Sequence, residues 1–216
     1  MKGDATRIRP TLELERAELA LAPGAIAGVD EAGRGPWAGP VVAAAVVLDL
    51  NNLPVGLADS KTLDEAAREE AFASIRKCAA YGVGVADVER IDKENILNAT
   101  LWAMSQAVGQ LAEQGIKPRL ALIDGNRMPH LGCDARLIVK GDAKCLSIAA
   151  ASIVAKVTRD RMMVQIAEAF PGYGFERHKG YGTPQHRDAL QRLGASAIHR
   201  RSFRPVQLAL GLVAPV

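Results

Sequence analysis

The amino-acid sequence predicts an α/β fold: a five-stranded mixed sheet flanked by helices, with a small helical C-terminal extension. Five short apolar runs bounded by turn-forming residues are typical of buried strands, and the longer segments among them have helical periodicity. After Pro171-Gly172 the composition changes to Gly, Tyr, His and Arg. The 216 residues suffice for one core domain and a small appendage. We therefore expect a lead-in helix in residues 1–24, a core over 25–171 and a basic helical extension over 172–216.

The order of the expected strands predicts how they pair. The first strand begins at Ile26, and the others cover residues 40–48, 81–85, 120–123 and 135–139. The first three can form an antiparallel meander, and the fourth returns through a helical crossover and can lie parallel to the first. Parallel neighbours end at the same edge of a sheet, where open α/β sheets place their sites. Residues that follow the first and fourth strands should therefore meet.

The expected helices follow from start signals, stop signals and apolar stripes. Thr62 and Glu65 have capping-box spacing, Thr183-Pro184 supplies an N-cap and a first helical residue, and Gly194 supplies a stop. The fourth helix begins with small residues, which let a helix lie close to a sheet. The expected helices cover residues 11–21, 62–79, 91–114, 145–170, 183–194 and 205–213.

The segment that carries the strongest functional signal directly follows the apolar residues of the first expected strand. Asp30 and Glu31 come at its end, and Gly33, Arg34 and Gly35 follow at once. Burying an unpaired charged side chain costs roughly several kcal/mol, or else the side chain becomes neutral. We therefore expect both carboxylates at the C-terminal end of the strand, facing solvent or a cation. The two glycines lack a Cβ where another backbone could approach, and Arg34 brings a forked cation there.

Two further carboxylates, Asp124 and Asp142, also follow apolar runs directly. Four carboxylates at one end of a sheet repel one another unless cations neutralise them, and oxygen ligands suit Mg²⁺ or Mn²⁺. Two such ions roughly 4 Å apart could clamp a phosphodiester, one activating a water and the other stabilising the leaving oxygen. The ordinary alternatives are a helix N-cap for Asp142 and an Asp-Gly turn for Asp124. Asp160 competes for the fourth place, although Lys156 four residues earlier favours a helix-surface ion pair.

The C-terminal part of the chain is basic. Residues 172–205 include seven Lys and Arg but only two Asp and Glu. This excess of positive charge is typical of a surface that binds a polyanion, and the alternative is a basic surface in contact with solvent alone. Tyr181 between glycines could stack on a sugar or base, and Lys179 could meet a phosphate; the alternative is a tyrosine packed on the core. Residues 199–204 could track a phosphate backbone or form an exposed turn. Lys61 could contact phosphate or be solvated.

The cysteine content and the apolar runs indicate where in the cell the protein is located. Three scattered cysteines without zinc-site spacing indicate reduced thiols and a cytoplasmic protein. Acidic residues among the first twenty exclude a signal-peptide core, and the most apolar run, residues 40–48, is too short to span a bilayer. We expect no membrane partner and a monomer.

The ordered set of motifs resembles bacterial ribonuclease HII over nearly all of residues 26–206. The motifs that carry the resemblance are Asp30-Glu31-Ala32-Gly33-Arg34-Gly35-Pro36, Asp59-Ser60-Lys61, Asp124-Gly125-Asn126, Lys140-Gly141-Asp142, Ser147 through Lys156 with Arg159-Asp160, His178-Lys179-Gly180-Tyr181-Gly182-Thr183 and His199-Arg200-Arg201-Ser202-Phe203. The resemblance implies a ribonuclease H-like fold. It also implies metal ligation by the residues matching Asp30, Glu31, Asp124 and Asp142.

The resemblance further implies the substrate. The Gly33-Arg34-Gly35 motif would read the 2′-hydroxyl at an RNA–DNA junction, and Tyr181 would stack on the sugar after the scissile phosphate. We expect an endonuclease that needs Mg²⁺ or Mn²⁺ and cuts on the 5′ side of ribonucleotides, in RNA–DNA hybrids or singly embedded in duplex DNA. The products would be 3′-hydroxyl and 5′-phosphate ends.

Three other functions are weighed against this one. A junction resolvase or transposase-like nuclease of the same fold would cut all-DNA substrates. A non-catalytic nucleic-acid binding module would show salt-sensitive binding without turnover, but it leaves the four acids unexplained. A carboxylate-pair glycosidase is disfavoured because adjacent Asp30 and Glu31 cannot flank a sugar from opposite faces.

Overall fold

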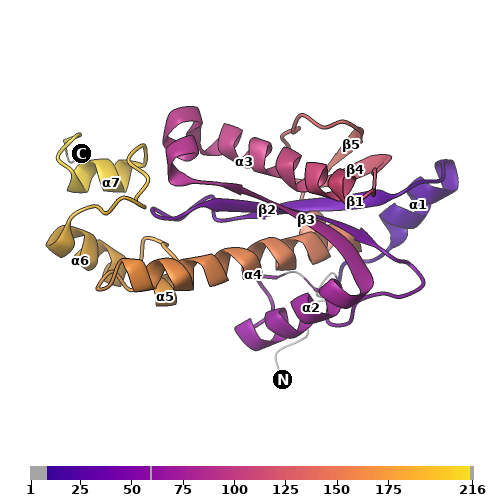
Figure 1. Ribbon diagram of the computed structural model, residues 1–216, viewed down its shortest axis with the longest axis horizontal. Coiled ribbons are helices and arrows are strands. Elements are labelled where there is room, and N and C mark those ends of the chain that lie inside the picture. The colour runs from indigo at the N-terminus through magenta and orange to yellow at the C-terminus, as the bar shows by residue number, and fades with distance from the viewer. Residues whose placement is uncertain (1–8, 59, 215–216) are drawn as a thin grey trace, which may run out of the picture.

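The computed structural model describes residues 9–58 and 60–214 (Figure 1). Residues 1–8, which belong to the expected lead-in segment, lie outside the described residues, as do Asp59 of the quoted motif and residues 215–216. Within the described part, no helix is long and apolar enough to cross a membrane. The three cysteines are free thiols.

The sheet has the expected five strands and the expected mixed topology. Its order is β3-β2-β1-β4-β5, with β1 antiparallel to β2 and β2 antiparallel to β3, while β4 runs parallel to both β1 and β5. The register aligns Val29 of β1 with Ile123 of β4. The strands are β1 (Ile26–Ala32), β2 (Val41–Leu48), β3 (Ala79–Ala86), β4 (Leu120–Asp124) and β5 (Asp134–Ile138).

Seven α-helices and one 3₁₀ helix complete the described part of the chain. The expected helices are present, but α7 ends at Ala209 rather than near residue 213, and the short α5 was not expected. The elements are α1 (Glu13–Leu21), α2 (Glu65–Cys78), α3 (Val88–Glu113), η1 (Gly141–Ala143), α4 (Leu146–Ala169), α5 (Phe175–His178), α6 (Pro184–Leu193) and α7 (Arg204–Ala209).

Two helix starts differ from the expectation for local chemical reasons. The N-cap of α2 is Asp64 rather than Thr62, because the Asp64 carboxylate accepts a hydrogen bond from the backbone N–H of Ala67. Helix α3 begins earlier than expected and is kinked at Asn95, whose φ is +69°. The Asn95 side chain accepts from the N–H groups of Leu97 and Asn98, so it caps the second part of the helix.

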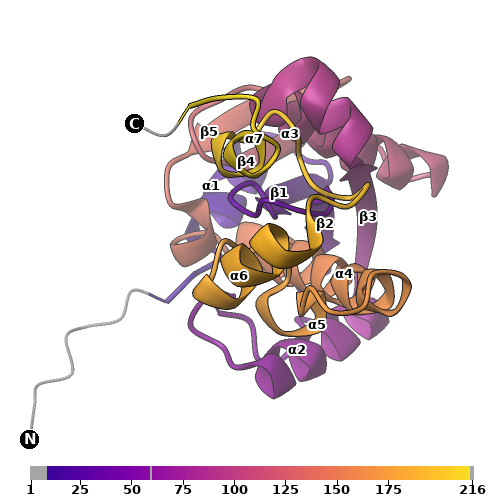
Figure 2. The same cartoon turned by 90° about the vertical axis from the view of Figure 1, so that its left-hand side faces the viewer.

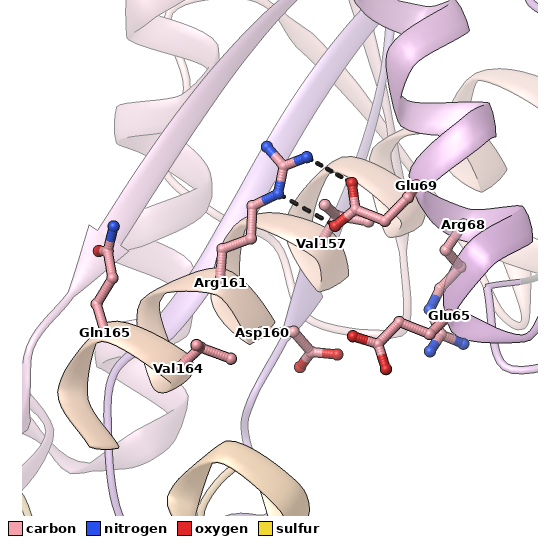
Figure 3. Close-up of a pocket in the computed structure, with 8 residues that line it drawn as sticks. All are labelled: Glu65, Arg68, Glu69, Val157, Asp160, Arg161, Val164 and Gln165. Atoms are coloured by element: carbon pink, nitrogen blue, oxygen red, sulfur yellow. Dashed lines mark hydrogen bonds and ion pairs between the residues drawn. The ribbon is translucent and has the colours of Figure 1, made fainter. Parts of the chain in front are cut away.

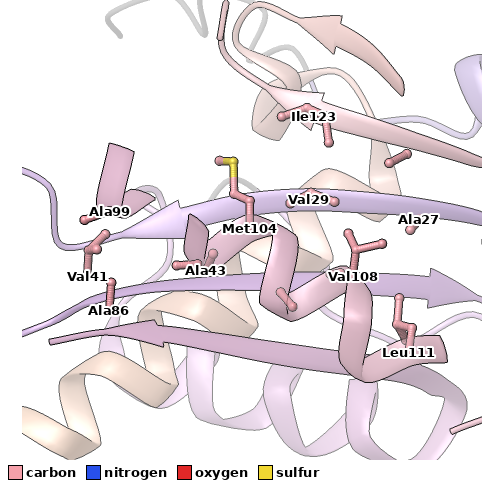
Figure 4. Packing of buried hydrophobic residues seen from close by; sticks show 14 of the residues in the cluster. Ala27, Val29, Val41, Ala43, Ala86, Ala99, Met104, Val108, Leu111 and Ile123 are labelled. Atoms are coloured by element: carbon pink, nitrogen blue, oxygen red, sulfur yellow. The ribbon is translucent and has the colours of Figure 1, made fainter. Parts of the chain in front are cut away.

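The sheet lies between two helical layers. Helix α3 covers one face, and α4 with α2 covers the other (Figures 1 and 2). Alternate residues of β2 point to opposite layers: Ala43 and Ala45 belong to the cluster with α3 shown in Figure 4, and Ala44 and Val46 pack with α2 and α4. Because both faces are covered, β2 reads as a continuous apolar run rather than an alternating one.

Close helix approach depends on small residues, as the sequence predicts for α4. A Cβ at Gly28 of β1 would lie 2.1 Å from the backbone carbon of Ser147, in the first turn of α4. Gly84 of β3 is crossed in the same way by α3, where a Cβ would lie 2.0 Å from the Ala103 carbonyl oxygen. Helix α4 therefore crosses β1 directly and brings its polar residues to the end of that strand.

The extension packs on one end of the sheet, where α5, α6 and α7 gather (Figures 1 and 2). Its backbone pairs with the β1–β2 loop: Trp37 N–H donates to Gly180 O, Gly39 N–H to Ile198 O, and Arg200 N–H to Trp37 O. The expectation that residues 199–204 track a phosphate backbone is wrong at its start. Arg200 is buried because that loop covers it, and His199 is buried because its ring packs against Tyr173, Phe175 and His186.

Candidate active site

The four sequence-predicted carboxylates come from three parts of the fold. Asp30 and Glu31 lie in β1, Asp124 is the last residue of β4, and Asp142 lies in η1 after β5. Because β1 and β4 are parallel neighbours, their ends meet. Carboxylate oxygens of Asp30, Asp124 and Asp142 all lie within 4.8 Å of one another. The predicted convergence of Asp30 with Asp124 is thus present, with Asp142 joining them.

Asp30 and Glu31 lie at the C-terminal end of β1, as expected, but Asp30 does not face solvent. Both belong to β1 and have ladder partners in β2, Ala44 and Ala43. Asp30 is only 5% exposed. Its Oδ1 accepts a 2.7 Å hydrogen bond from the Glu31 N–H, which partly compensates for its burial.

Backbone and side-chain donors hold the other two carboxylates. Asp124 Oδ1 accepts a 2.6 Å hydrogen bond from Gly141 N–H, just after the left-handed residue Lys140. Asp142 Oδ2 accepts from Lys61 Nζ at 2.7 Å, so the Lys61 ammonium meets a carboxylate rather than being merely solvated. The Arg34 guanidinium lies 3.3 Å from Glu31. The cationic side chains of Lys61 and Arg34 therefore lie beside the carboxylates of the site.

The electrostatics of the cluster favour a bound cation. Burial, followed by the charges of Glu31 and Asp124, raises the pKa of Asp30 well above its ordinary value. Burial also raises the pKa of Glu31, opposed by Arg34, and the pKa of Asp124, opposed by the Gly141 N–H. A hard divalent ion would relieve both the repulsion and the burial of charge, and oxygen-only donors suit Mg²⁺ or Mn²⁺. The residues present fit such an ion.

One pocket joins the carboxylates to most of the predicted substrate-binding residues. It contains the predicted residues Gly33, Arg34, Gly35, Lys61 and Tyr181, beside Asp30, Glu31 and Asp124. Lys179 does not line this pocket, and its ammonium donates to the carbonyl of Glu176 in its own short helix. The residues of this pocket that were not among the predicted site residues are Ala32, Ser60, Arg68, Ser152 and Lys156. Ser152 and Lys156 are spaced i, i+4 on α4, the signal by which they could have been found.

Tyr181 presents its ring to this pocket. The residue is 44% exposed, which excludes a tyrosine packed in the core. The Lys156 ammonium and the Arg159 guanidinium lie 6.0 and 5.9 Å from its ring centre. A Cβ built at Gly35 would lie 3.8 Å from the Tyr181 ring. The aromatic ring and the glycine loop therefore adjoin each other in the lining of one pocket.

Asp160 lies apart from the carboxylate cluster. Its Oδ1 accepts from Lys156 Nζ at 2.8 Å, so the favoured interpretation as a helix-surface ion pair is confirmed. Figure 3 shows Asp160 in a second pocket between α2 and α4, where Arg161 pairs with both carboxylate oxygens of Glu69. Asp160 is not among the three carboxylates that gather around Asp30.

Solved structures share this architecture. The structure of the PCNA:RNase HII complex from Archaeoglobus fulgidus superposes with a TM-score of 0.70 at 28% identity, covering 83% of this chain and 95% of that one. Bst-RNase HIII in complex with Mn²⁺ gives a TM-score of 0.71 at 19% identity, covering 88% and 70%, and supports the fold alone. The fold and the site together define an enzyme of the ribonuclease H class, a metal-dependent endonuclease.

The chain belongs to the ribonuclease HII family, whose model matches residues 27–206. The ribonuclease HII of Parvibaculum lavamentivorans is 61% identical over 183 residues, 84% of this chain and 67% of the relative. That of Rhizorhabdus wittichii is 54% identical over 197 residues, 91% and 94% of the two chains. Membership of the family implies endonuclease activity on RNA–DNA hybrids.

Proposed function

We propose that this enzyme hydrolyses the phosphodiester on the 5′ side of ribonucleotides, both in RNA–DNA hybrids and at single ribonucleotides embedded in duplex DNA. The products would be 3′-hydroxyl and 5′-phosphate ends. The observation that carries the proposal is one pocket lined by the carboxylates of Asp30, Glu31 and Asp124, by the Gly-Arg-Gly loop and by the exposed ring of Tyr181, with the Asp142 carboxylate next to those of Asp30 and Asp124. A scissile phosphate at the carboxylates would place its neighbouring sugar beside the loop and the ring.

Asp30, Glu31, Asp124 and Asp142 would hold the divalent ions, either Mg²⁺ or Mn²⁺. When bound, such ions activate the attacking water and stabilise the leaving oxygen, as in other two-metal nucleases. The residues of the chain supply the rest. The Gly141 N–H and the Glu31 N–H fix the carboxylate oxygens of Asp124 and Asp30. Lys61, which contacts Asp142, would move to a substrate phosphate when cations take its place.

Selectivity for RNA would come from the loop and the ring. The 2′-hydroxyl is the group that distinguishes a ribonucleotide from a deoxyribonucleotide. The Gly33-Arg34-Gly35 loop would hydrogen-bond it, and Tyr181 would stack on the adjoining sugar. Lys156, beside the ring, would contact the backbone phosphate there. Lys179 lies outside the pocket, so its contact would be with a phosphate farther along the duplex.

One assay tests the proposal and separates it from its rivals. A duplex with a single ribonucleotide is incubated with Mg²⁺, with Mn²⁺ or with chelator, beside an all-DNA duplex of the same sequence. We expect metal-dependent cleavage 5′ to the ribonucleotide only, and none by Asp124→Asn, which should still bind the duplex. Cleavage of all-DNA duplex would favour a resolvase-like enzyme. Salt-sensitive binding without turnover would favour a binding module.

Three further expectations belong to the same proposal. Nucleic acid is the expected partner, the protein is expected to act as a monomer, and its expected location is the cytoplasm. The division into core and C-terminal extension is likewise proposed, with the extension supplying Tyr181 to the pocket of the core. Sedimentation at micromolar concentration, alone and with duplex, would test the monomer.

A further inference from the structure

Two buried arginines lie beneath the β1–β2 loop, residues 33–40. Arg159 from α4 is 1% exposed, and Arg200 from the extension is fully buried. In the described part of the chain neither forms a salt bridge with a carboxylate. Burying a guanidinium without a counter-charge is costly unless hydrogen bonds to its N–H groups compensate for the lost hydration. What these guanidinium groups bond to therefore indicates why they are there.

Arg200 bonds only to loop carbonyls. Its Nε donates to Gly39 O at 2.9 Å, its Nη1 to Arg34 O at 2.9 Å, and its Nη2 to Gly33 O at 2.5 Å and to Pro40 O at 3.1 Å. Four carbonyls from both ends of the loop thus converge on one planar fork. A lysine ammonium is a single point with three donors and cannot match this spread of acceptors.

Arg159 supports the same loop from the side of α4. Its Nε donates to Pro40 O at 2.9 Å and its Nη2 to Ala38 O at 3.2 Å. Gly33 has a φ of +98°, and a Cβ there would lie 2.0 Å from Arg159 Nε. Gly33 is therefore needed because this guanidinium packs against it, whereas Gly35 borders the Tyr181 ring in the pocket. Packing within the protein therefore requires a glycine at Gly33 but not at Gly35.

Peptide planarity then fixes the outer face of the loop. The carbonyl of one residue and the N–H of the next belong to one planar trans unit and point in opposite directions. Because Gly33 O and Arg34 O point inward to Arg200, the N–H groups of Arg34 and Gly35 must point outward. Neither N–H donates to another group of the described residues. The outward N–H groups are thus available to a hydroxyl oxygen in the pocket.

We propose that Arg200 is a positioning residue for ribose recognition: its guanidinium, with Arg159 beside it, holds the loop carbonyls inward and so presents the Arg34 and Gly35 N–H groups to the 2′-hydroxyl. The inference rests on the proposed function and adds to it a role for the C-terminal extension. Arg200 touches neither substrate nor metal. It acts through the loop, so its loss should reduce discrimination between ribose and deoxyribose more than it reduces metal binding.

The test compares two adjacent arginines. Arg200→Lys keeps the charge and loses the fork, and Arg201→Lys is the matched control at an exposed residue. Each is made in the non-cleaving Asp124→Asn background, and its dissociation constant is measured for a duplex with one ribonucleotide and for the all-DNA duplex. We expect the ratio of the two constants to fall on the order of tenfold in Arg200→Lys and to stay unchanged in Arg201→Lys. Mn²⁺ titration of each arginine variant without the Asp124 change should match wild type.

The outcomes separate the two proposals. If the Asp124→Asn parent itself binds both duplexes equally, the proposed ribose recognition fails and the inference fails with it. If the parent discriminates and Arg200→Lys discriminates equally well, the inference alone is overturned. Should Arg200→Lys not fold, amide hydrogen exchange on the otherwise unaltered enzyme decides. The Arg34 and Gly35 amides should exchange fast in the free protein and be protected by the ribonucleotide duplex but not by DNA. Slow exchange in the free protein contradicts the inference.

Discussion

Replacing Asp124 by Asn should stabilise the metal-free protein while abolishing catalysis. Asp124 shares the cluster with Asp30 and Asp142, all within 4.8 Å of one another. Two unit charges at that separation repel by about 3 kcal/mol at an effective dielectric constant of 20. Asn keeps an oxygen that can accept the Gly141 N–H. The substitution therefore removes charge without removing the hydrogen bond.

The net gain should be smaller than the bare repulsion. Part of the repulsion is already relieved because the raised pKa of Asp30 favours its neutral form, and Lys61 neutralises part of the charge on Asp142. We expect a gain of about 1–2 kcal/mol in the free energy of unfolding, or about 2–8 °C in melting temperature for a chain of this size.

Thermal melts in chelator and in Mn²⁺ check both halves of this prediction. In chelator, Asp124→Asn should melt above wild type. In Mn²⁺, wild type should gain stability by ligand binding and the variant should gain much less. A variant that melts below wild type in chelator, or that Mn²⁺ stabilises as much as wild type, would refute the claim that these carboxylates are crowded for a cation.

Three further predictions concern residues around the site. Glu15→Ala should cost about 2 kcal/mol in chemical denaturation, because the buried Glu15 carboxylate accepts hydrogen bonds from the Ser147 N–H in the first turn of α4 and from the Cys145 thiol. The control is the same change at the exposed Glu13 of α1, and an equal cost there would contradict this role. Gly33→Ala should cost more than about 2 kcal/mol through backbone strain and overlap, whereas Gly35→Ala should cost less than about 0.5 kcal/mol; equal melting temperatures would contradict the packing argument. Burial lowers the pKa of both His186 and His199 to about 4, so each ring is neutral in the folded protein at neutral pH. Their contribution to the free energy of unfolding is therefore complete above pH about 6.5. It is lost as the pH falls toward 4, by up to about 3 kcal/mol for each histidine. Melts from pH 7.5 to 4.5 should show this decline, and His186→Gln should weaken it; a flat profile would contradict the buried neutral pair.

The sheet and the acidic cluster were predictable from the sequence because their signals are local. Apolar runs mark the strands, and connection rules orient β4 along β1, so Asp30 and Asp124 had to meet. What could not be predicted is burial that depends on distant segments. Asp30 lies inside β1 because the strand continues past it, paired with β2, and because α4 crosses the same strand at Gly28.

The adjacent residues Arg200 and Arg201 are a second case in which burial could not be predicted from the sequence. In the sequence they are equal members of a basic run, and the pattern allows phosphate contacts or an exposed turn for both. In the fold, Arg200 is buried under the β1–β2 loop while Arg201 is exposed. Nothing local distinguishes them, because the difference arises from backbone pairing between the extension and that loop. Lys179 likewise turns to its own helix rather than to the pocket.

The most direct test of the metal-centre account is to locate the ion. A crystal of the enzyme soaked in Mn²⁺ and measured at the manganese absorption edge should show anomalous density among the carboxylates of Asp30, Asp124 and Asp142, with Lys61 displaced from Asp142. Anomalous density elsewhere in the protein, or none in this cluster at saturating Mn²⁺, would contradict the account.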